Sequence, residues 1–78
     1  MNLRTTEIPE LLGQKTGRYI QHDMGIYYMR EASGADVTIE KDRREFAVQP
    51  TANQMDELID AGLLRREGSR YYSENPTN

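Results

Sequence analysis

Hydrophobic and polar residues alternate with two different periods along this chain, and the change of period predicts where helix gives way to strand. Residues 6–14 combine Thr6 as a capping residue, a proline in the first turn and two adjacent leucines, which predicts a short helix ended by Gly13 and Gly17. From residue 18 the period becomes two, which predicts extended chain. The expected strand segments are RYIQ (18–21), GIYYMRE (25–31), VTIEK (37–41) and REFAVQ (44–49). Separated by the HDMG turn, the ASGAD loop and the KDRR tip, they predict an antiparallel meander.

A second helix is predicted after Pro50, where the sheet pattern stops. Thr51 followed by Gln54 is a capping-box pattern, which places the helix start there. Gly62 fits the left-handed position after the helix end, and Leu63 is then expected to contact the last turn. Three apolar residues at helical spacing form the stripe expected to face the core: Met55, Leu58 and Ile59.

The C-terminal segment predicts one more hairpin. Leu64 begins a strand, EGS turns the chain and RYYSE returns it. The predicted fold is therefore an α+β domain, in which a small antiparallel sheet (meander plus C-terminal hairpin) packs against two short helices on one face. We expect one domain over residues 1–78, frayed at 1–4 and 75–78. The predicted core comprises Ile26 or Tyr27, Val37, Ile39, Phe46, Val48, Met55, Leu58, Ile59 and Leu63.

Composition narrows the function classes. The chain has 78 residues and no cysteine, which excludes disulfides, thiolate chemistry and cysteine-built zinc sites. No run is apolar enough for a membrane span or a signal peptide, so we expect a complete cytoplasmic polypeptide without membrane partners. The net charge of −3 gives no chain-wide basic field for phosphate. A small core of this kind leaves a homodimer open.

Candidate chemistry is sparse. His22 is the only histidine, and neighbouring residues on a strand diverge, so His22 and Asp23 form no catalytic pair there; we expect a turn or surface histidine. The segment GQKTG lacks the glycine that a phosphate-binding loop places before its lysine. The paired carboxylates Asp56 and Asp60 fit a solvated helix face. The sequence thus predicts no catalytic residues, no metal and no cofactor, and a protein that is not an enzyme.

Two tyrosine doublets carry more information. Tyr27–Tyr28 and Tyr71–Tyr72 each lie on a predicted strand, where period two sends one ring of each pair to each face. If helices cover one face, the other keeps two tyrosines, with Arg30 beside Tyr28. Such residues are enriched at interaction hot spots, whereas the alternative is that the rings merely cover a thin sheet.

The segment LIDAGLLRREGSRYYS resembles the last helix and wing of winged-helix regulators. The resemblance covers residues 51–74, about a third of the chain. It implies a helix that enters a DNA groove and a wing whose arginines (Arg65, Arg66 and Arg70) contact phosphate. The matching helix instead carries Asp56, Glu57 and Asp60, which phosphates repel, and the family has further helices where this chain predicts strands.

Two classes of function follow. The first is a small non-catalytic binding protein, inhibitor-like or adaptor-like, that binds a larger protein through a tyrosine- and arginine-bearing sheet face and an acidic helix. The alternative is a winged-helix-like nucleic-acid-binding regulator that uses the 63–73 hairpin. By analogy with small inhibitors encoded by phages or plasmids, we consider such an origin for this chain. The predicted partner-binding residues are Tyr27, Tyr28, Arg65, Arg66, Arg70, Tyr71 and Tyr72.

Overall fold

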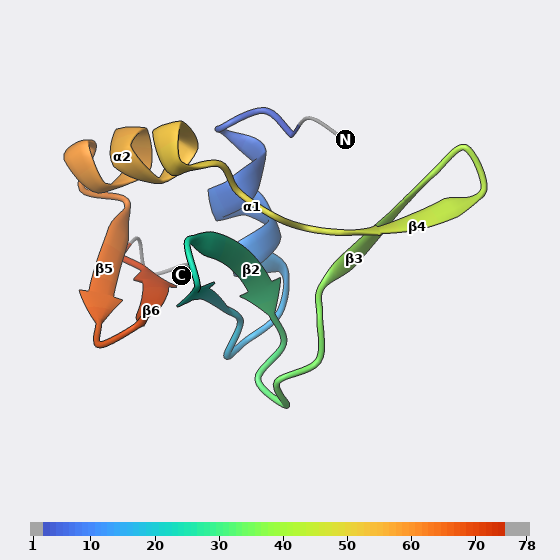
Figure 1. Ribbon diagram of the computed structural model, residues 1–78, viewed down its shortest axis with the longest axis horizontal. Helices are drawn as coiled ribbons and strands as arrows, with labels where there is room; N and C mark the ends of the chain where they lie inside the picture. The colour runs from blue at the N-terminus through green and yellow to red at the C-terminus, as the bar shows by residue number, and fades with distance from the viewer. Residues whose placement is uncertain (1–2, 75–78) are drawn as a thin grey trace.

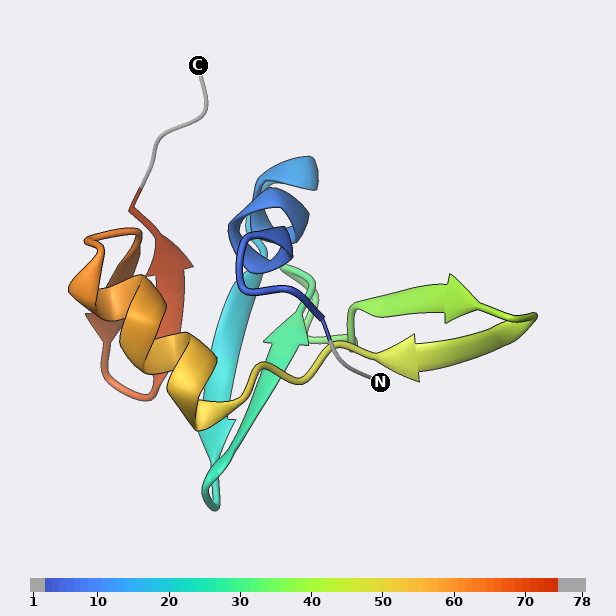
Figure 2. The ribbon, with the colours of Figure 1, turned by 90° about the horizontal axis from the view of Figure 1, so that it is seen from above.

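The computed structural model describes residues 3–74 and has an α+β architecture, as predicted. Two helices lie on one side of a four-stranded antiparallel sheet, and a separate two-stranded hairpin projects from the body (Figures 1 and 2). The elements in chain order are α1 (Glu7–Gln14), β1 (Tyr19–Asp23), β2 (Ile26–Arg30), β3 (Thr38–Lys41), β4 (Arg44–Ala47), α2 (Ala52–Asp60), β5 (Leu64–Glu67) and β6 (Arg70–Ser73). Of the residues expected to be frayed, 1–4 and 75–78, residues 1–2 and 75–78 lie outside the described part.

The strand order departs from the predicted continuous meander. In the main sheet the order is β2-β1-β6-β5, so the first hairpin pairs with the C-terminal one, and β3-β4 forms a sheet of its own. The backbone of Met29 explains why β3-β4 is separate, because it lies on the free edge of β2, the end strand of the main sheet. Its N–H donates to the Val48 carbonyl and its carbonyl accepts from the Val37 N–H, both at 3.0 Å. The hairpin base thus occupies this edge, and β3-β4 leads away from the body (Figure 1).

The core lies between the helices and the main sheet. Its buried members are Ile8, Leu12, Ile20, Met29, Val37, Val48, Met55, Leu58, Leu64 and Tyr71. Of the predicted core, Val37, Val48, Met55 and Leu58 are buried, and Tyr27, Ile39 and Leu63 are partly buried against it. Ile59 is exposed, Phe46 is half-buried on the projecting hairpin, and Ile26, the alternative to Tyr27, is exposed.

Helix α2 forms as its local sequence predicts. The Thr51 hydroxyl accepts from the Gln54 N–H at 3.1 Å, and the Gln54 side chain accepts from the Thr51 N–H at 3.0 Å. At the other end Gly62 adopts a φ of 75°, a conformation that residues with a side chain rarely adopt. The Leu63 N–H then donates to the Leu58 carbonyl at 3.0 Å, as in a Schellman motif.

The N-terminal region differs from its prediction in three ways. Thr6 makes no side-chain cap; the Glu7 carboxylate instead accepts from the Arg4 N–H at 3.0 Å. Gly13 lies inside α1 rather than ending it. Leu3, expected in a loose end, is half-buried against the core, and its carbonyl accepts a hydrogen bond from the Gln54 side chain.

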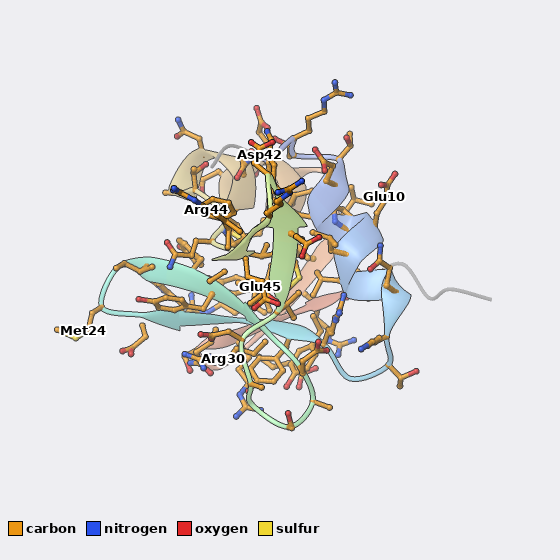
Figure 3. The ribbon with its side chains drawn as sticks, turned by 90° about the vertical axis from the view of Figure 1, so that its right-hand side faces the viewer. Glu10, Met24, Arg30, Asp42, Arg44 and Glu45 are labelled. Atoms are coloured by element: carbon orange, nitrogen blue, oxygen red, sulfur yellow. The ribbon has the colours of Figure 1, made fainter. Side chains whose placement is uncertain are left out.

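Two of the three hairpins in the described chain end in exposed tips with paired positive φ angles. Met24 and Gly25 connect β1 to β2 with positive φ angles, and Asp42 and Arg43 connect β3 to β4 in the same way, as type I′ turns require. Figure 3 places Met24 at the far end of the first tip and Asp42 and Arg44 at the second. Met24 is 95% exposed and lies on the turn itself, outside both sheet faces.

Candidate functional site

The main sheet has two faces of different chemistry. Cross-strand partners share a face, so the register assigns each side chain to one of them. The inner face, covered by the helices, carries Ile20, His22, Tyr27, Met29, Leu64, Arg66, Tyr71 and Ser73. The outer face carries Tyr19, Gln21, Tyr28, Arg30, Arg65, Glu67, Arg70 and Tyr72, together with Asp23 and Ile26 near the first tip. Tyrosine and arginine thus dominate the face that no helix covers.

The two rings of each tyrosine doublet point to opposite faces of the sheet, as predicted. Tyr71 is 5% exposed and belongs to the core, and Tyr27 is half-buried against it. Their rings meet edge-on with centroids 5.9 Å apart. Burial raises the pKa of Tyr27, and the neighbouring Tyr71 hydroxyl raises it further. Tyr71 was predicted to contact a partner; burial removes it from any such surface.

His22 was expected in a turn or at the surface; it lies half-buried on strand β1 and contacts the same inner-face tyrosine. Its ring stacks on Tyr27, with centroids 4.2 Å apart and an interplanar angle of 9°. The Arg66 guanidinium, the third predicted site residue on the inner face, donates to the Gly68 carbonyl at 2.9 Å. Sequence reasoning grouped Arg66 with Arg65 and Arg70, whereas the register places it on the opposite face from them.

The outer face brings the other four predicted residues together: Tyr28, Arg65, Arg70 and Tyr72. Across the four strands one row runs Arg30, Tyr19, Tyr72, Arg65. The neighbouring row runs Tyr28, Gln21, Arg70, Glu67. We call these eight residues the outer-face grid. Four of them were not among the predicted partner-binding residues: Tyr19, Gln21, Arg30 and Glu67. The strand that contains Tyr19 and Gln21 has no tyrosine doublet, so it was not selected.

Arginine and tyrosine side chains contact one another throughout the outer-face grid. The Arg70 guanidinium lies 4.3 Å from the centroid of the Tyr19 ring. Arg30 lies 5.4 Å from the Tyr28 ring, and Arg65 lies 5.5 Å from the Tyr72 ring. These distances fall within the range of cation–π attraction, which holds both partners in one geometry. The grid is therefore an ordered surface in which each arginine is supported by a ring.

Carboxylates neutralise two of these three arginines within the chain. Arg30 forms an ion pair with Asp36 at 3.2 Å. Arg65 forms one with Glu67 at 2.6 Å and a longer one with Glu74 at 3.9 Å. A surface whose cations are already paired attracts phosphate weakly, because a polyanion must compete with the bound carboxylates. The grid consequently offers aromatic contact area and hydrogen-bond donors, while its net electrostatic potential is weak.

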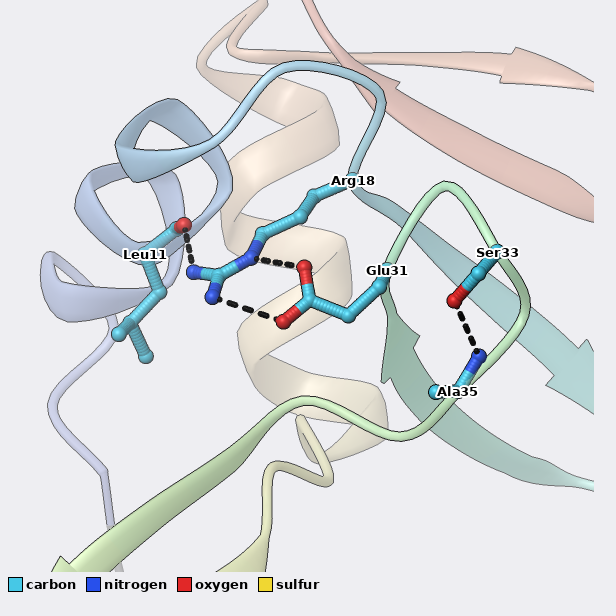
Figure 4. Close-up of polar contacts among 5 residues, drawn as sticks. All are labelled: Leu11, Arg18, Glu31, Ser33 and Ala35. Carbon is cyan, nitrogen blue, oxygen red and sulfur yellow. Dashed lines mark hydrogen bonds and ion pairs between the residues drawn. The ribbon is translucent and has the colours of Figure 1, made fainter.

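A buried arginine fixes the loop beside the outer-face grid. The Arg18 guanidinium donates to both Glu31 carboxylate oxygens, at 2.8 and 3.1 Å, and to the Leu11 carbonyl at the end of α1, at 2.7 Å (Figure 4). The hydrogen bond from Arg18 lowers the pKa of the Glu31 carboxyl. Gly17, with φ at 87°, allows the backbone before Arg18 to lie close to Ala32 in the loop after β2. A Cβ at Gly17 would lie 2.6 Å from the Ala32 Cβ.

Within residues 3–74, no group of three or more histidine, aspartate or glutamate side chains is placed to hold a metal ion. The helices in this part of the chain are all too short and too polar to cross a membrane. Comparisons with protein-family models, curated proteins and solved structures found no match for this chain.

Proposed function

We propose that this protein is a small non-catalytic binding module that acts by docking the outer-face grid onto a larger protein. The observation that carries the proposal is the ring-supported arrangement of Tyr28, Tyr72 and three arginines on the sheet face that no helix covers. Tyrosine and arginine are the residue types that contribute most to protein interfaces, because they bury large areas and donate several hydrogen bonds. Rings already held by guanidinium contacts lose less side-chain entropy on binding.

The acidic helix supplies a second determinant on the other side of the molecule. Asp56, Glu57 and Asp60 are exposed on α2. Glu57 accepts a hydrogen bond from the Thr5 hydroxyl at 3.1 Å, which leaves the aspartates as the freest carboxylates of this group. A negative helix layer repels nucleic acid and other acidic surfaces, so it favours partners that engage the opposite, outer face.

Affinity capture with matched bait variants tests the proposal. The wild-type chain, the double variant Tyr28→Ser/Arg70→Gln and the control Arg43→Gln are used as baits in nuclease-treated lysate of the native host. We expect one stoichiometric protein with the wild type and with the control, and its loss with the double variant. Equal capture by all three baits, or capture only before nuclease treatment, would contradict the proposal.

A nucleic-acid regulator is the second candidate. It is favoured by α2 leading directly into the β5-β6 hairpin, with Arg65, Arg66 and Arg70 all exposed. A salt titration separates the two candidates. Binding of a duplex through three arginines weakens steeply between about 50 and 200 mM salt, whereas a complex centred on aromatic anchors weakens far less.

Self-association is the remaining partner class, and it stays a prediction. Light scattering across a dilution series of the purified chain measures it directly. A dimer that dissociates in the Tyr28→Ser/Arg70→Gln variant would identify a second copy as the occupant of the outer-face grid.

A further inference from the structure

Within residues 3–74, one cation of the outer-face grid forms no ion pair with a carboxylate, and it lies near the centre of the grid. Arg70 on β6 has Gln21 on one side and Glu67 on the other. The Glu67 carboxylate, however, lies 2.6 Å from the Arg65 guanidinium. Among the ion pairs of the described residues none includes Arg70, which contacts the Tyr19 ring instead. Among the three arginines of the grid, Arg70 is therefore the one whose charge can pair with an anion from a partner.

The Tyr19 ring holds Arg70 in place. Tyr19 is only 5% exposed, although it lies on the outer face, because Arg70, Tyr72 and the loop at Gly34 surround it. A guanidinium supported by a ring keeps N–H donors at its rim for acceptors in its own plane. Two such donors match the two oxygens of a carboxylate. The Tyr72 side chain also hydrogen-bonds to Arg70, so ring and hydroxyl contacts together hold the guanidinium, and its further N–H donors can serve an anion.

We infer that the partner presents an acidic side chain, aspartate or glutamate, to Arg70, so that an acidic peptide segment occupies the outer-face grid. This inference rests on the proposed function. Charge complementarity selects the chemistry: the flanking arginines are already paired with Asp36, Glu67 and Glu74, whereas Arg70 alone among the three grid arginines forms no ion pair within the described residues. Those carboxylates disfavour a phosphate chain, which would bring several charges close to them, but leave room for one carboxylate at the centre. The rings of Tyr19 and Tyr72 beside Arg70 would exclude water from that pair.

A displayed library of random twelve-residue peptides tests the inference. Peptides are selected on the wild-type protein, and their affinities are then measured on the wild type and on Arg70→Gln. We expect an aspartate or glutamate at one shared position, and a loss of affinity of about tenfold or more when that residue is changed to its amide or when Arg70 is changed to Gln. The two changes together should cost little more than one, because both remove the same pair. The control Arg43→Gln, the same change at the hairpin tip, should leave the affinity unchanged.

The opposite outcomes are equally distinct. Peptides that lack a shared acidic residue, and that depend on Tyr28 and Tyr72 but not on Arg70, would overturn the inference and leave the proposed function standing. A library that yields no peptide dependent on any residue of the grid would overturn both. Arg70-dependent, salt-sensitive binding of a fluorescent fifteen-nucleotide oligothymidine would also overturn both and favour nucleic acid. Arg70→Lys, which keeps the charge but not the fork of donors, should retain only part of the peptide affinity.

Discussion

The two faces of the main sheet share the same strands but differ in how their side chains are held. On the inner face Ile20 and Met29 are completely buried beneath the helices. On the outer face Tyr28, Arg65 and Arg70 are held by ring and ion-pair contacts at the surface. Apolar burial stabilises in proportion to the area removed from water, whereas exposed pairs contribute little. The comparison indicates that burial on the inner face maintains the fold, whereas the exposed contacts of the outer face contribute little to stability.

The largest expected effect comes from the centre of the inner face. Met29→Ala should destabilise the domain by about 3 kcal/mol, because it removes a fully buried side chain and leaves a cavity. A domain of this size has little stability in reserve, so a fraction unfolded without denaturant is expected. Urea denaturation followed by circular dichroism measures the change. A cost below that of the outer-face change Tyr28→Ala would contradict the division of roles.

Changing Arg18 tests how much a buried polar contact contributes to the free energy of unfolding in comparison with an apolar one. Arg18→Ala should cost about 2 kcal/mol, since the Leu11 carbonyl and the Glu31 carboxylate both lose their donor. Glu31→Gln keeps the shape of the side chain and serves as the companion variant. If Arg18→Ala were as stable as the wild type in urea, the pair would not be structural.

The capping box of α2 is expected to contribute less. Thr51→Ala removes the hydroxyl that accepts from the Gln54 N–H and should cost about 1 kcal/mol. Thr51→Ser keeps the acceptor and should restore most of that stability. Thermal unfolding of the two variants gives the comparison, and equal values for both would show that the cap contributes nothing.

Acid should destabilise the fold through the Arg18–Glu31 contact. The hydrogen bond from Arg18 lowers the pKa of Glu31, so the folded state favours the carboxylate. The resulting stability is complete above the ordinary carboxyl pKa and is lost as the pH falls through the lowered folded value. We expect the urea midpoint of the wild type to decrease as the pH is lowered below about 5. The decrease should be smaller in Glu31→Gln. An identical pH dependence in both chains would exclude this carboxyl as the cause.

The smallest effect is expected on the outer face itself. Arg65→Ala breaks exposed ion pairs with Glu67 and Glu74 and should change the free energy of unfolding by no more than about 0.5 kcal/mol. If the outer face serves binding, the same change should still weaken capture of the partner. A large loss of stability in urea would instead give Arg65 a structural role and blur the comparison.

Local sequence was sufficient for much of this fold. The capping box at Thr51, the left-handed Gly62 and the divergence of the tyrosine doublets all follow from interactions within a few residues, and the structure has each of them. Half of the candidate site was predicted for the same reason, because parity on a strand needs no knowledge of its neighbours.

Tertiary structure alone decided which strands are neighbours. The pairing of β1 with β6 joins segments about fifty residues apart, and it is this pairing that brings Tyr19 under Arg70 and beside Tyr72. The separation of β3-β4 likewise depends on which edge of β2 is occupied at Met29. The backbone N–H and carbonyl groups of an edge strand can pair with many other strands. Local residues therefore determine the shape of each hairpin, but only the packing of the whole chain determines where the hairpin lies.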